Sequence, residues 1–91
     1  MTDAPRFTRS PHVLQRRTLD AYAVLAIEGE APLVLVGTGA DVWSLLAEPH
    51  TLDELVQLLA GRYAGDPEVI ARDVTELLDT LVGSGVAVCL R

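Results

Sequence analysis

The segment from Gly37 to Val86 decides the fold. It reads GTGADVWSLL at 37–46, TLDELVQLLAGRYAG at 51–65 and DPEVIARDVTELLDTLVGSGV at 66–86. Each piece opens with residues that favour a helix start and continues with apolar residues at helical spacing, so three short helices are predicted. They follow one another too closely to leave room for an enzyme's site between them. The layout therefore indicates a small recognition module.

The helix ends carry specific capping signals. A Ser or Thr followed three residues later by an acid forms a capping box, and proline suits the first helical position. A glycine just beyond the last turn ends a helix without strain. The expected capping residues are Thr38 with Asp41, Thr51 with Glu54, Asp66 with Pro67, and Gly83 at the end of the last helix.

Three apolar strands are predicted upstream, at Val13–Arg16, Ala21–Glu28 and Pro32–Val36, with a hairpin turn at Glu28–Glu30 between the last two. Proline cannot donate to a strand ladder, so Pro32 predicts that the third strand lies at the edge of the sheet for part of its length. An exposed apolar edge invites another strand to pair with it. The third strand is therefore the first place to look for binding.

The chain has 91 residues, which corresponds to one domain. We expect a loose arm at 1–11, which is polar and contains Pro5 and Pro11, and a single folded domain at 12–91. No apolar run is long enough to span a membrane, and the N-terminus lacks the apolar core of a signal peptide, so a cytoplasmic protein without a membrane partner is expected. The single cysteine, Cys89, excludes an internal disulfide and lies among apolar residues, which favours a buried thiol.

Charge is distributed unevenly along the chain. Residues 1–17 carry four Arg and one Asp, whereas residues 18–91 carry three Arg against twelve acids, for a net charge of −6. An acidic body repels phosphate, so nucleic acid is an unfavourable partner, while a basic peptide would be attracted. His12 and His50 have no Cys or acid at ligand spacing, and no nucleophile with a base is evident. The sequence therefore predicts no catalytic site, no metal and no cofactor.

The order of these pieces resembles the PqqD-like family, whose members are also called RiPP recognition elements. The resemblance covers roughly residues 10–91 and rests on GTGADVWSLL, TLDELVQLL, the tyrosine in GRYAG, and DVTELLDTLVGSGV with its apolar tail. Many relatives carry Asn where this chain has Gly37. The resemblance implies an α+β, winged-helix-like fold, in which a three-stranded antiparallel β-sheet is followed by three α-helices.

The resemblance also implies a function. Members of the family bind the leader segment of a ribosomally made precursor peptide, which adds as a strand to the third strand and lies beside the third helix. A free-standing acidic chain of this size is most similar to the leader-binding protein of lasso-peptide systems, which presents a basic leader with a Tyr-x-x-Pro element to a separate leader peptidase and to a cyclase. The alternatives are a PQQ-type peptide carrier for a radical-SAM enzyme and, with less support, a winged-helix protein that binds nucleic acid.

Eight residues are candidates for contact with the leader. They are Leu33, Val34, Leu35 and Val36 on the third strand, and Val69, Arg72, Asp73 and Glu76 on the third helix. For the strand, the alternative is that both sets of side chains belong to the core. The helix acids either pair with a basic leader or are ordinary solvated surface, and Arg72 could instead pair with Glu68 or Glu76. Trp43, between apolar neighbours, is expected in the core.

Overall fold

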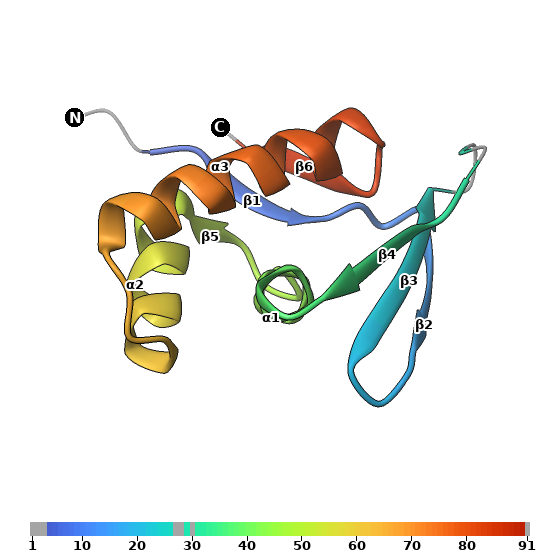
Figure 1. Cartoon of the computed structure of the whole chain (residues 1–91). Coiled ribbons are helices and arrows are strands. Elements are labelled where there is room, and N and C mark those ends of the chain that lie inside the picture. Colours follow the sequence, from blue (N-terminus) through green and yellow to red (C-terminus); the bar gives the residue numbers. More distant parts are fainter. Residues whose placement is uncertain (1–3, 27–28, 30, 91) are drawn as a thin grey trace.

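The computed structural model describes residues 4–26, 29 and 31–90. The strands are β1 (Arg6–Arg9), β2 (Val13–Arg17), β3 (Ala21–Ala26), β4 (Leu33–Val36), β5 (His50–Thr51) and β6 (Ala87–Leu90), and the helices are α1 (Thr38–Leu45), α2 (Leu52–Arg62) and α3 (Pro67–Gly83) (Figure 1). An antiparallel sheet in the order β2-β3-β4 precedes the three helices. The predicted α+β arrangement is therefore confirmed. The predicted turn at Glu28–Glu30 lies outside the described residues, apart from Gly29.

A second sheet, in the order β5-β1-β6, corrects the expectation of a loose arm at the N-terminus. Strand β1 lies between β5 and β6, and Phe7 of β1 is opposite Cys89 of β6 and packs against the core. Pro5 and Pro11 flank this strand instead of interrupting it. The partner strands of β1 come from distant parts of the chain. The polar residues of this segment therefore did not predict a strand, because the strand is stabilised by pairing in the folded protein.

The second and third helices begin as predicted. Thr51 accepts a hydrogen bond from the backbone N–H of Glu54 at 3.1 Å, and the Glu54 carboxylate accepts from the N–H of Thr51 at 2.8 Å, which completes a capping box. Asp66 caps α3 through the N–H of Glu68, and Pro67 occupies the first turn. These caps satisfy N–H groups that a helix start otherwise leaves without a partner.

Two other helix ends differ from the prediction. Helix α1 begins one residue early, because Gly37 rather than Thr38 is the N-cap, and it has no side-chain cap. Gly37 adopts φ +56° and ψ −126°, a conformation that lets the chain turn directly from β4 into α1. At the other end of the domain, α3 includes Gly83, and it is Gly85 that takes the positive φ.

The core lies where the helices meet the inner side of both sheets, and Trp43 is at its centre with no exposed surface. The Trp43 indole N–H donates to Gln15 of β2 at 2.9 Å. The Arg9 guanidinium lies 4.8 Å from the centre of the indole ring and donates to the Trp43 carbonyl. Trp43 therefore joins both sheets to α1, as expected for a core residue.

Candidate functional site

The candidate site begins with the open edge of β4. Among the described residues, β4 pairs with β3 alone, whereas β3 lies between two strands. Pro32 immediately precedes β4, so the edge position predicted from this proline is confirmed. The edge presents backbone groups with which an incoming strand can pair.

The two faces of β4 differ sharply in exposure. The Leu35 side chain is 6% exposed and belongs to the core, and Leu33 packs against it. Val34 and Val36 are 67% and 60% exposed. The alternative that both sets of side chains are buried is therefore wrong, and the outward pair is Val34 with Val36.

The ladder also determines which backbone groups face the open edge. The N–H of Thr18 donates to the carbonyl of Ala21 at 2.9 Å, which directs the backbone groups of Ala21 toward β2. Successive residues of an antiparallel strand direct their N–H and C=O groups to opposite sides. Tyr22 and its partner Leu35 therefore bond each other, and Val34 is left with its N–H and C=O directed outward.

The same alternation assigns the remaining groups. Val36 also directs its N–H and C=O toward the open edge, and so does Pro32, which has no N–H to offer. A peptide strand at this edge would therefore exchange hydrogen bonds with Val34 and Val36. Leu33 and Leu35 would support it from within the sheet.

The candidate residues of α3 are all exposed. Val69 is 44% exposed, and the Arg72 and Asp73 side chains are 70% and 60% exposed. At 100° per residue, Val69, Asp73 and Glu76 fall on one flank of α3, while Arg72 points away from the core. Helix α3 packs chiefly on α2, β6 and α1. This flank is therefore open to solvent, and β4 is not among the elements that make the main contacts with α3.

Arg72 differs from its expected pairing. Its Nε lies 3.9 Å from the carboxylate of the adjacent Asp73, rather than beside Glu68 or Glu76. At this distance and exposure the pair contributes little to stability. The Asp73 carboxylate consequently remains accessible to a cation from a ligand.

A polar hollow of about 330 Å³ lies elsewhere, between the β2–β3 turn and the start of α1. Tyr63 donates a hydrogen bond to Asp41 at its rim, and Arg62 lies 3.4 Å from the same carboxylate. The bond to Asp41, which holds the phenol in its protonated form, raises the pKa of Tyr63. None of the eight candidate residues lines this hollow, and the sequence contained no signal for it because its walls come from separate elements.

A second hollow is lined by His50, Glu54, Gln57 and Leu58. The backbone N–H of Thr51 donates to Glu54, and this bond lowers the pKa of the Glu54 carboxyl. Since Glu54 already completes the helix cap and lies 3.2 Å from Arg6, this carboxylate has a structural role.

The open edge of β4 is suited to binding. Within the part of the chain that the structure describes, no group of three or more His, Cys, Asp or Glu side chains could hold a metal ion. No helix among the described residues is long and apolar enough to cross a membrane. An open strand edge with outward apolar side chains is a known receptor for an extended peptide.

Comparisons with known proteins agree with this fold. A solved structure described as TbiB1 in complex with the TbiA(beta) leader peptide superimposes with a TM-score of 0.81, at 24% sequence identity, over 88% of this chain and 93% of that one. No curated protein matches the chain. The family model described as coenzyme PQQ synthesis protein D (PqqD) matches residues 21–87, which include β3, β4 and all three helices. The chain therefore belongs to the PqqD family.

Proposed function

We propose that this protein binds the leader segment of a ribosomally synthesised precursor peptide by strand addition to β4. The observation that carries the proposal is the open edge of β4, where Val34 and Val36 have both exposed side chains and outward backbone groups. The solved structure of TbiB1, with which this chain shares its fold, holds a leader peptide. Membership of the PqqD family supports the same class of function.

The partner peptide is proposed to be basic and to contain a Tyr-x-x-Pro element, as in lasso-peptide leaders. The body of the protein is acidic, and Asp73 and Glu76 lie exposed on one flank of α3. Exposed carboxylates attract a basic strand and orient it, with more effect on the rate of association than on affinity. The protein then presents the bound precursor to a separate leader peptidase and to a cyclase, and performs no catalysis of its own.

Fluorescence polarisation tests the proposal. A labelled basic peptide with Tyr-x-x-Pro is titrated with the protein, alongside the same peptide carrying Tyr→Ala. Saturable binding at micromolar protein is expected, and the Ala peptide should bind more weakly because it loses a large buried contact. Absence of binding at these concentrations, or equal binding of both peptides, would overturn the proposal.

A further inference from the structure

A second surface emerges from the register of the β2-β3-β4 sheet. Val34 is opposite Ala23, which is opposite Arg16, and Leu25 is opposite Leu14. Residues directly opposite each other in a sheet share a face. The outer face, defined as the side bearing Val34, therefore consists of Leu14, Arg16, Ala21, Ala23, Leu25, Val34 and Val36.

This outer face is unusually apolar for a surface turned to solvent. One side of an antiparallel sheet normally packs on the core and the other carries polar residues. Here the inner side places Val24 and Leu35 in the core. On the outer side, the residues Leu14 and Val36 are each 60% exposed, and Val34 is 67% exposed. Contiguous exposed apolar surface of this kind marks an interaction site.

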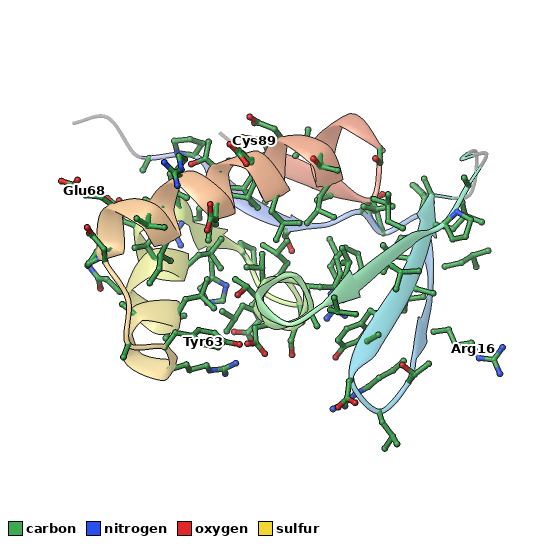
Figure 2. All side chains as sticks on the ribbon, viewed as in Figure 1. Arg16, Tyr63, Glu68 and Cys89 are labelled. Carbon is green, nitrogen blue, oxygen red and sulfur yellow. The ribbon has the colours of Figure 1, made fainter. Side chains whose placement is uncertain are left out.

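The helices leave this face uncovered. Helix α1 packs against β3 and β4, and it lies to the left of the sheet in Figure 1. Figure 2 shows the Arg16 side chain projecting to the right, away from the helices. At the tip of the adjoining β2–β3 turn, Leu19 is 98% exposed. The outer face is therefore open to solvent on the side of the sheet away from α1, and the exposed β2–β3 turn adjoins it at one end.

Arg16 gives this surface a charge preference. The three other arginines of the N-terminal part are engaged, since Arg6 lies 3.2 Å from Glu54, Arg9 stacks on Trp43, and Arg17 lies 5.8 Å from the centre of the Tyr22 ring. Among the described residues, Arg16 has no carboxylate within ion-pair distance. A partner with an apolar patch and a carboxylate opposite Arg16 would satisfy both features, whereas the outer face of a second copy of this chain carries no carboxylate to pair with Arg16.

The outer face is distinct from the open edge of β4, where the leader is proposed to bind, but the two surfaces adjoin each other. Strand β2 lies on the opposite side of the sheet from the open edge of β4. A leader strand added to β4 would extend the same sheet and so enlarge the same face. An enzyme docked on β2 and β3 would then lie beside the bound precursor.

We propose that the outer face of the β2-β3-β4 sheet docks the separate leader peptidase, through an apolar patch that carries a carboxylate opposite Arg16. This inference rests on the proposed leader-binding function and specifies where the second partner binds. Leu14 and Arg16 anchor the contact, and because they are remote from β4 they take no part in holding the leader.

The experiment measures two affinities for each variant. Biolayer interferometry with the purified leader peptidase reports docking, and fluorescence polarisation with the labelled basic peptide reports leader binding. The variants are Leu14→Thr and Arg16→Glu, with Arg16→Lys as the charge-preserving control and Leu58→Thr as the control for loss of an exposed leucine on α2. Leu58 is 44% exposed.

Docking should weaken by about tenfold or more in Leu14→Thr and in Arg16→Glu, because both remove a central contact. It should stay near wild type in Arg16→Lys and Leu58→Thr, and all four variants should bind the basic peptide as wild type does. Unchanged docking in Arg16→Glu, or no docking by the wild-type protein, would overturn the inference. So would sedimentation equilibrium showing a dimer that Arg16→Glu abolishes. Loss of peptide binding in the wild type would instead refute leader binding.

Discussion

Gly37 shows how one residue connects the edge strand to the helices. Its φ of +56° lies in a region that side chains with a Cβ rarely adopt, and it allows β4 to pass into α1 without a loop. A Cβ built on Gly37 meets no atom within 4 Å, so any cost of a larger residue arises from the backbone and not from crowding. The position is structural, and it sets the angle at which the end of β4 leaves the sheet.

Gly37→Ala should therefore destabilise the protein by about 1–3 kcal/mol, the cost of holding a residue with a Cβ in a sparsely populated positive-φ conformation. The matched control is Gly61→Ala in α2, where a Cβ also meets nothing within 4 Å and φ is not positive. That change should instead stabilise the protein by about 0.5–1 kcal/mol. Urea unfolding followed by the fluorescence of Trp43 measures both, and equal effects of the two substitutions would contradict the assigned role of Gly37.

At the level of the strand, β4 divides its residues by function. Leu35 directs its side chain into the core and its backbone groups toward β3, whereas Val34 directs both its side chain and its backbone groups outward. The strand can therefore lose an outward N–H without losing a bond of its own ladder. Leu35 therefore contributes to the stability of the sheet, whereas Val34 contributes to its capacity to accept a further strand.

Val34→Pro should leave the fold intact and weaken binding of the basic peptide by about tenfold, since it removes one donor at the open edge. Leu35→Pro should unfold the sheet, because it removes a ladder donor and a core side chain, losses that together cost roughly 3 kcal/mol or more. Circular dichroism reports the fold and fluorescence polarisation the binding. Val34→Thr keeps the N–H and is the control, and full binding by a folded Val34→Pro protein would argue against strand addition here.

At the scale of the whole molecule, the net charge of the protein affects how a charged ligand approaches it. A net charge of −6, with one flank of α3 bearing Asp73 and Glu76, produces a field that attracts a basic ligand before contact. Such a field changes association rates and is screened by salt, with a Debye length of about 10 Å at 0.1 M and about 3 Å at 1 M. The effect of an acid therefore depends on whether it lies near the path of the ligand.

Asp73→Arg should slow association of the basic peptide several-fold at low salt, and the difference should disappear near 1 M salt. Asp79→Arg is the matched control, since it makes the same change in net charge on the outer face of the same helix, about 120° around the axis from Asp73. Stopped-flow fluorescence measures both rates. If the two variants slow association equally, the effect belongs to net charge alone and Asp73 does not border the binding path.

Local signals predicted much of this fold. The three helices, the capping box at Thr51, the Asp66 cap and the burial of Trp43 all follow from patterns within a few residues, and the structure confirms them. Pro32 likewise predicted an edge strand because its missing N–H acts locally. The family was also identifiable from the order of these pieces.

Strand β1, the outward face of β4 and the apolar outer face could not be predicted in this way. Arg6–Arg9 becomes a strand only because β5 and β6 pair with it, and Val34 faces outward only because Leu35 packs beneath α1. Periodicity along the chain shows which residues share a face, but long-range packing chooses which face is buried. The sequence thus determined that an open edge exists, and the assembled sheet and helices decided what that edge presents to a partner.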